Sequence, residues 1–421
     1  MMRKMTLVAL LFAGLVASGC DLDLSDPNSP TEEAVFGDGQ NLILVAIGLQ
    51  AEAAAMMGPQ IFVSSLTADE MGAGSASFDN FKAADAGDDL VAGQYLSEAP
   101  WAAAYRVNKL AEDLLEAVPG ANLRAGTRSG VLAMAKLFKA MAFAHLATLF
   151  EAAPIDAGID KPDAEFALRT EVLAEAINLL TSARSDIAAE PLSDEFRDDV
   201  QATGFDVEVT IYAMLARYNL MLGNYAEAAS EAQSVPPAAR SEFRFSAADQ
   251  NPVYTIAYNS GNAWQVRARQ ELRLNAESGD ERVDFWVSAA NIQGASRTLD
   301  DLAKYRAPDE SFAVFLPDEM KLIRAEAAAR NSDLAAAITL INEVRTQCDV
   351  TGEPAACLNA LDSTDLPTQQ AVLDEILEQR RYELYLQGLR LDDLRRFDVQ
   401  RKYDFLPLPQ SECDRNASAP C

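Results

Sequence analysis

The sequence predicts a mainly α-helical fold, in which paired helices form a repeated scaffold and long irregular segments interrupt it. Two segments, 211–235 and 321–345, each read as helix, short polar turn, helix. Between the helical segments lie stretches rich in glycine, proline, acids and aromatics that are too long to be simple linkers. With 421 residues and 49% hydrophobic content, the chain can bury a large core. We therefore expect one helical scaffold that carries large loop insertions.

The two helix pairs have small residues at matching positions. Ala216 and Ala228 are twelve residues apart, and so are Ala325 and Ala337. Small residues at this separation let two antiparallel helices approach closely. The pattern resembles the tetratricopeptide repeat, with the inter-helix turn of the first copy at 223–225. A generic helical hairpin is the alternative, but two copies in register favour the repeat.

The remaining elements follow from helical spacing and from its interruptions. Helices are expected over 42–57, 101–118 and 131–150, and residues 137–150 with 171–187 are expected to form a further, more irregular pair. Glycines, acids and two phenylalanines make 69–90 a long loop of the kind that carries function. The predicted organisation is a signal peptide at 1–19 and a single domain at 20–421. That domain has a helical scaffold at about 30–235 and 316–400, an irregular insertion at about 236–315, and an irregular tail at about 403–421.

The N-terminus has the pattern of an export signal. Arg3 and Lys4 precede an apolar run, 7–16, that is too short to span a bilayer, and small residues at 17–19 lead directly to Cys20. This resembles the bacterial lipoprotein signal, in which that cysteine is lipidated. An ordinary secretory signal with an incidental cysteine is the alternative. We expect the protein to be attached to the membrane only through this lipid anchor, with no later membrane-spanning segment. Asp21, directly after the cysteine, leaves open whether that membrane is the inner or the outer one.

The charge and the motifs exclude several classes of function. A net charge of −29 argues against nucleic-acid binding, which needs clustered lysine and arginine. The single histidine, His145, lies in an apolar helical run and is predicted to be a packing residue. The sequence contains no phosphate-binding loop, no zinc-protease motif and no serine-hydrolase elbow. We therefore expect no cofactor and assign no catalytic residue, although acid pairs of the kind that glycoside hydrolases use stay open among the 64 acids.

The other four cysteines form two local pairs, Cys348 with Cys357 and Cys413 with Cys421. In an exported protein such pairs close small loops as disulfides, which we favour over free thiols. A zinc site is disfavoured by the spacing.

Aromatic residues in the loops are the candidate ligand-binding residues. Rings beside amide and carboxylate groups suit a carbohydrate, because sugar C–H faces stack on rings while hydroxyls bond to polar groups. The alternative for each ring is burial in the core. The candidates are Phe78, Asp79, Asn80, Phe81, Tyr254, Tyr258, Asn259, Trp264 and Trp286, with Asn262 nearby.

A structural calcium ion is a less favoured expectation. Two acidic groups were considered for it: Asp85, Asp88 and Asp89 in the first loop, and Asp280 with Glu281 in the insertion. Neither has the spacing of an EF-hand, and acidic surface loops are usually only solvated.

Three C-terminal stretches, at 316–345, 378–396 and 403–412, together resemble the SusD/RagB family. The resemblance extends over nearly the whole chain because it also includes Cys20 and the spacing of Trp101, Tyr105 and Asn108. Residues 236–315 match only loosely, and Gln379 stands where the family usually has glutamate. Other departures are a glutamine at 387 and a leucine at 391.

The resemblance implies a surface-exposed outer-membrane lipoprotein with a helical-repeat scaffold and no reaction of its own. It also implies a partner, a SusC-like TonB-dependent transporter, and an oligosaccharide or, in some members, a peptide as ligand. Ligand sites would lie in the loop excursions. The alternatives are a tetratricopeptide scaffold with a groove for protein partners and, less favoured, a glycoside hydrolase.

The stretch 380–398 looks basic but is nearly neutral when its acids are counted. Arginine–acid pairs are expected at Arg380 with Glu383 and at Asp392 with Arg395, with Gly388 marking a close approach or a break in the helix. We interpret the stretch as a structural clasp to the preceding repeat and to the tail.

Overall fold

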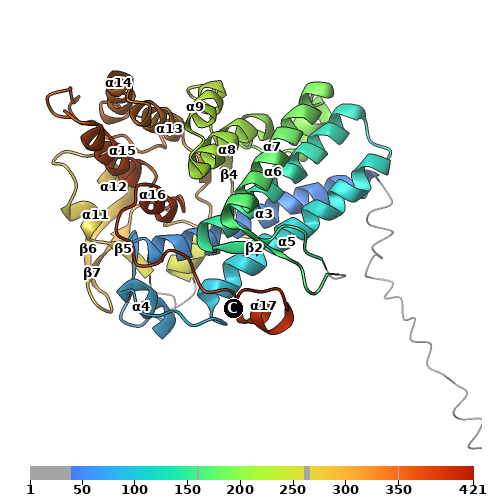
Figure 1. Cartoon of the computed structure of the whole chain (residues 1–421), viewed down its shortest axis with the longest axis horizontal. Coiled ribbons are helices and arrows are strands. Elements are labelled where there is room, and N and C mark those ends of the chain that lie inside the picture. Colours follow the sequence, from blue (N-terminus) through green and yellow to red (C-terminus); the bar gives the residue numbers. More distant parts are fainter. Residues whose placement is uncertain (1–38, 159–160, 260–265, 349) are drawn as a thin grey trace, which may run out of the picture.

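The structure is a computed structural model that describes residues 39–158, 161–259, 266–348 and 350–421 (Figure 1). Long helices form most of it, and short strands and helical turns fill the insertion, which confirms the predicted helical scaffold with large insertions. The signal peptide and the lipidation site Cys20 lie outside the described residues, as do Asn262 and Trp264.

The N-terminal half is a layer of long helices around α6. Its elements are α3 (Gly39–Thr67), α5 (Tyr95–Ala117), η1 (Val118–Gly120), α6 (Ala125–Leu149), α7 (Arg169–Ala189) and η2 (Phe196–Val200). In Figure 1, α6 runs between α5 and α7. Because α6 has apolar residues on every side, burial against several neighbours is the arrangement that stabilises it.

Both α3 and α6 are long and apolar enough by composition to cross a membrane, contrary to our expectation for segments after the signal. Half of the apolar window of α3 and 78% of that of α6 is buried inside the protein. At this extent of burial, α3 and α6 are helices of the protein core.

The predicted histidine role is confirmed within α6. Burial lowers the pKa of His145 to about 3, with a smaller contribution from Arg217, so the imidazole is neutral and packs among apolar neighbours.

The two predicted helix pairs are present and have the expected close contacts. They are α8 (Val207–Leu222) with α9 (Tyr225–Ser234), and α13 (Pro317–Arg330) with α14 (Leu334–Arg345). The four alanines at the matching positions are all fully buried. Gly223 ends α8 with φ of +80°, a conformation that glycine adopts without strain. The repeat prediction is therefore confirmed at the level of the helix pairs.

A buried ion pair joins one helix pair to the other. Arg217 on α8 contacts Glu319 on α13 at 2.6 Å, and both side chains are almost fully buried. The same guanidinium donates to the carbonyl oxygen of Val314 at 2.9 Å.

The insertion is more regular than predicted. Its elements are β4 (Ser241–Phe243), α10 (Pro252–Tyr254), η3 (Thr255–Asn259), β5 (Val266–Arg269), α11 (Glu271–Leu274), α12 (Arg282–Trp286), β6 (Val287–Gln293), β7 (Thr298–Leu302) and β8 (Phe312–Phe315). The predicted loop 69–90 likewise contains β1 (Met71–Ala73) and α4 (Asp79–Ala86). The four-stranded sheet has the order β1-β5-β7-β6, and all its paired neighbours are antiparallel. Two smaller sheets pair β4 with β8 and β2 (Ala152–Pro154) with β3 (Phe166–Leu168).

The C-terminal motif is two helices, α15 (Gln369–Glu383) and α16 (Arg390–Arg396), separated by a turn. Gly388 lies in that turn with φ of +73°, and a Cβ atom there would lie 3.7 Å from Ile61 of α3. Gly388 therefore marks a helix break, one of its two predicted roles, while a Cβ there would meet α3 only at ordinary van der Waals distance.

The arginines of this motif pair with carboxylates of the same protein. Arg380 contacts Asp393 at 2.9 Å, so the predicted partner Glu383 was wrong; Glu383 instead faces Arg282 at 3.5 Å. The predicted pair of Asp392 with Arg395 is present at 3.4 Å. The turn between α15 and α16 explains the difference, because it folds Asp393 back onto Arg380.

The clasp reaches both segments that the sequence indicated. Arg396 contacts Glu326 of α13 at 2.9 Å, which ties the motif to the preceding repeat. Arg395 donates to the carbonyl oxygens of Asp404 in the tail and Thr148 in α6.

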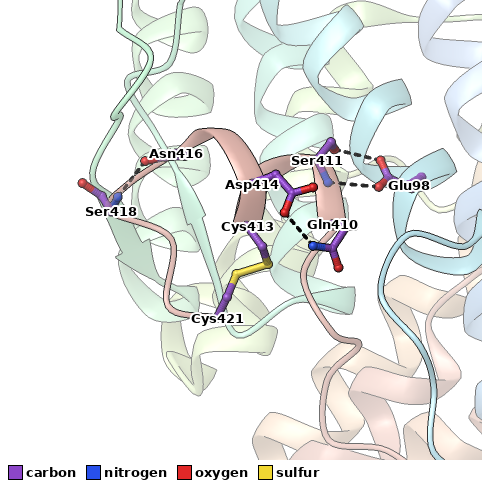
Figure 2. The surroundings of a disulfide bond; sticks show 8 residues. All are labelled: Glu98, Gln410, Ser411, Cys413, Asp414, Asn416, Ser418 and Cys421. Atoms are coloured by element: carbon purple, nitrogen blue, oxygen red, sulfur yellow. Dashed lines mark hydrogen bonds between the residues drawn. A yellow bond between two sulfur atoms is a disulfide. The ribbon is translucent and has the colours of Figure 1, made fainter.

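The tail ends in α17 (Gln410–Arg415), which lies against the start of α5 (Figure 2). Ser411 donates to Glu98 at 2.9 Å, and Glu412 accepts from the indole of Trp101 at 3.2 Å. A disulfide joins Cys413 to Cys421, and a second joins Cys348 to Cys357, as the sequence suggested.

Candidate functional site

Two segments far apart in the sequence meet beside the C-terminal half of α3. The first excursion pairs with the insertion through β1 and β5, and Gly74 bridges to Gly294 at the turn between β6 and β7. The insertion also packs on α3 through α10, where a Cβ atom on Gly58 would lie only 2.5 Å from Pro252. Both predicted loop excursions are therefore anchored on one helix.

The first group of candidates lies at the start of α4. The ring of Phe78 is 46% exposed, and its centroid lies 5.7 Å from that of Phe81 in an edge-on arrangement. Phe81 is fully buried, with its centroid 4.8 Å from that of Phe62 on α3. Asp79 is fully exposed and pairs with Lys82 at 3.3 Å. Phe81 thus fixes α4 to the core, while Phe78 and Asp79 face outward.

The second group lies on the helical turns α10 and η3. The side chain of Asn251 accepts from the backbone N–H groups of Val253 and Tyr254, at 2.8 and 3.2 Å, and so starts the turn. The turn widens to π-helical geometry over Thr255–Asn259, which brings the rings of Tyr254 and Tyr258 into a stack with centroids 5.9 Å apart. Both rings are partly exposed.

A polar cluster holds Tyr258 in place. Its hydroxyl donates to Asp301 at 2.8 Å, and the same carboxylate contacts Arg267 at 3.1 Å and Arg306 at 3.2 Å. The guanidinium of Arg267 lies 4.5 Å from the centre of the tyrosine ring. Burial, together with the hydrogen bond to Asp301, raises the pKa of Tyr258 well above its usual value. The phenol therefore stays protonated, and its hydrogen bond to Asp301 holds Tyr258 in the stack with Tyr254.

Beside this cluster, Asn259 is exposed and donates to Gln250 at 2.6 Å. Stacked tyrosines with neighbouring amide, carboxylate and guanidinium groups are chemically suited to a sugar, which needs an apolar ring face and hydrogen-bonding partners.

The sequence analysis missed Arg267, Asp301 and Arg306. These residues come from β5, from β7 and from the segment after β7, and only the antiparallel pairing of distant strands brings them to one point. No local pattern in the sequence marks them.

Trp286 does not lie at this surface. Its side chain is 2% exposed, its indole N–H donates to the carbonyl oxygen of Tyr382 at 2.8 Å, and its ring packs against Phe285, Tyr305 and Tyr385. The expectation that Trp286 contacts a ligand does not fit this position, and the same holds for Phe81. Asn80 is half-buried on α4, and the candidate Trp264 lies outside the described residues.

Of the acids named for calcium, Asp85 and Asp280 are engaged in ion pairs, whereas Asp88, Asp89 and Glu281 are exposed. Asp85 lies 3.4 Å from Arg269 and 3.3 Å from Arg297, and Asp280 contacts Arg282 at 2.7 Å. Within the described part of the chain, no group of three or more histidine, cysteine, aspartate or glutamate side chains is arranged to hold a metal ion.

The fold and the surface together define a class of protein: a helical-repeat scaffold whose insertions form an aromatic and polar surface. Residues 319–405 match the model of the SusD family. No curated protein sequence matches the chain.

Solved structures match nearly the whole chain. A SusD superfamily protein from Bacteroides fragilis is 15% identical with a TM-score of 0.71, and the match covers 92% of this chain and all of the other. One from Bacteroides thetaiotaomicron is 16% identical with a TM-score of 0.70, covering 90% and 98%. A SusD-like carbohydrate binding protein from Bacteroides vulgatus is 18% identical with a TM-score of 0.68, covering 86% and 84%.

These matches confirm the resemblance seen in the sequence. The chain has the SusD-like fold, and its C-terminal segment has the SusD family pattern.

Proposed function

We propose that this protein captures oligosaccharides at the stacked Tyr254 and Tyr258, with Phe78 of the first excursion as a further exposed ring. The stack is the observation that carries the proposal. Tyr258 is immobilised by Asp301 and by the guanidinium of Arg267, so Tyr254 lies on a rigid base and is partly exposed. An ordered ring loses little conformational freedom when a sugar stacks on it, which favours binding.

The proposal extends to location and delivery. The export signal that ends at Cys20 and the SusD-like fold support a lipid anchor in the outer membrane. From there the protein passes its ligand to a SusC-like TonB-dependent transporter. A Cys20→Ala variant should be released from the outer-membrane fraction, and the native protein should co-purify with a transporter; recovery of the native protein in the inner membrane would contradict this part.

Calorimetry with a panel of oligosaccharides tests the binding site. Tyr254→Ala should weaken binding by about tenfold, because the ring supplies the stacking face. Tyr212→Ala is the matched control: Tyr212 is also a partly exposed tyrosine with a nearby arginine, Arg184, but it lies on α8.

Binding that is unchanged in Tyr254→Ala, or weakened equally in both variants, would refute the site. New reducing ends on incubation with the ligand would favour the glycoside hydrolase instead.

A further inference from the structure

The helix pairs themselves form a groove. It has a volume of about 690 Å³ and lies between α9, the α13–α14 pair and α15. Its apolar wall includes Ala327, Leu340 and Leu373, and Gln233 and Gln369 bring amide groups to it. None of the sugar-site candidates lines this groove.

Arg324 lines the groove and has no partner within the described part of the chain. Its side chain is half-buried on α13 and makes neither a hydrogen bond nor an ion pair with a described residue. This is unusual in a protein with 64 acids and 35 lysines and arginines, where nearly every other described cation contacts an acid or a carbonyl oxygen. Among the described lysines and arginines, only Arg415, exposed in the tail, shares this property.

Asp333 also lines the groove, but its carboxylate accepts from the backbone N–H of Ala336 at the start of α14. Arg324 is therefore the lining charge without a partner among the described residues, and it complements a ligand that carries a carboxylate. A guanidinium group binds a carboxylate through two parallel hydrogen bonds, and an arginine that is already partly desolvated gives up less hydration to do so. Arg330, also at the groove, is already engaged, because it contacts Glu326 at 2.9 Å.

The shape and the lining favour a peptide over a sugar. Tyr225 is the aromatic residue among the lining side chains, and the guanidinium of Arg330 lies 4.9 Å from its ring centre. That face is therefore not open for a sugar to stack on. Small apolar side chains beside amide groups instead suit the side chains and the backbone of a peptide.

We propose that this groove binds a peptide segment of a partner protein, with an acidic side chain or a terminal carboxylate of that segment on Arg324. The proposal does not rest on the sugar-binding function, since the two surfaces share no residue. It assigns the helix pairs a role in binding besides their role as a scaffold.

A random peptide display library, selected on the full-length protein, tests this proposal. Selected peptides should share an acid at one position, and a synthetic peptide of the selected sequence gives the dissociation constant by calorimetry. Arg324→Glu should weaken that peptide by tenfold or more, because an attractive charge contact becomes repulsive. Changing the peptide's acid to its amide should weaken binding to the wild type but tighten binding to Arg324→Glu, because it removes the repulsion between two carboxylates.

Two further variants distinguish binding in the groove from a general effect of net charge and from loss of folding. Arg415→Glu changes the net charge equally but lies in the tail, so binding should stay within about twofold of wild type. Ala226→Trp fills the groove from an exposed position on α9 without a change of charge, and it should abolish binding. All three variants should melt at the wild-type temperature.

The proposal is overturned if no peptide is enriched, or if the selected peptide binds Arg324→Glu as tightly as wild type. Competition by polygalacturonate, an acidic polysaccharide, in the wild type but not in Arg324→Glu would also overturn it, in favour of an acidic glycan.

Discussion

Glu70 is fully buried at the junction between the first excursion, the insertion and the C-terminal motif. Its backbone carbonyl accepts from the hydroxyl of Tyr385 and from the backbone N–H of Arg269, both at 2.9 Å. Its carboxyl group accepts from the hydroxyl of Ser65 at 3.0 Å and from the backbone N–H of Leu386 at 3.2 Å. Burial raises the pKa of Glu70 to about 7, although the hydrogen bonds and nearby Arg390 oppose this effect.

This raised pKa predicts how stability depends on pH. The folded protein holds the Glu70 proton up to about pH 7, whereas the unfolded chain loses it near the ordinary value of 4.5. Protonation therefore stabilises the fold fully below pH 4.5, and this contribution is lost as the pH rises through 7. At about 1.4 kcal/mol for each pH unit between the two pKa values, the loss is about 3 kcal/mol.

Glu70→Gln tests this reasoning, because the amide is neutral at every pH and has nearly the same shape. The free energy of unfolding is measured by urea denaturation from pH 4.5 to 8 for both proteins. The difference between variant and wild type should change by about 3 kcal/mol over this range, in favour of the variant at high pH. Parallel pH profiles for the two proteins would refute the assignment of the raised pKa to Glu70.

Two further predictions concern the C-terminal region. Arg396→Ala should destabilise the fold by about 3–5 kcal/mol in urea denaturation, because it leaves the buried carboxylate of Glu326 without one of its two guanidinium partners. Arg324→Ala also truncates an arginine and is the control; it should lower the free energy of unfolding by less than about 0.5 kcal/mol. Equal losses of stability in the two variants would contradict this account. Replacing Cys413 and Cys421 by serine should lower the free energy needed to open the tail by about 2–3 kcal/mol. Trypsin should then cleave faster after Arg415, while the melting temperature of the scaffold stays unchanged. An unchanged cleavage rate would show that the other contacts of the tail suffice to hold it.

The helix pairs could be predicted from the sequence because their signal is local and repeated. The matching alanines lie at one spacing in both copies, and that spacing directly reflects the close contact of two adjacent helices. The clasp was also predictable in outline, since its arginines and acids lie within one short segment. The partner of Arg380 was not, because a turn at 384–389 brings Asp393 closer than Glu383.

The binding surface could be predicted only in part, because burial of a loop aromatic depends on distant segments. Trp286 is buried by a contact with Tyr382, 96 residues away in sequence. Strand β1 looks like part of a loop in the sequence and becomes a strand only by pairing with β5. Tyr254 and Tyr258 remain at the surface because the turn that Asn251 starts lies on the outside of α3 and not in the core of the protein.

The part of the chain that matches the SusD family model is distinct from the part proposed to bind sugar. Residues 319–405 contain Glu326, Arg380, Asp393 and Arg396, whose ion pairs join α13, α15 and α16. The sugar-site candidates lie outside this range, in segments whose positions depend on β1 pairing with β5. Glu70 is where the two parts meet, because it bonds to Leu386 on one side and to Arg269 on the other. Loss of its proton should therefore affect the position of the binding loops more than the helix pairs.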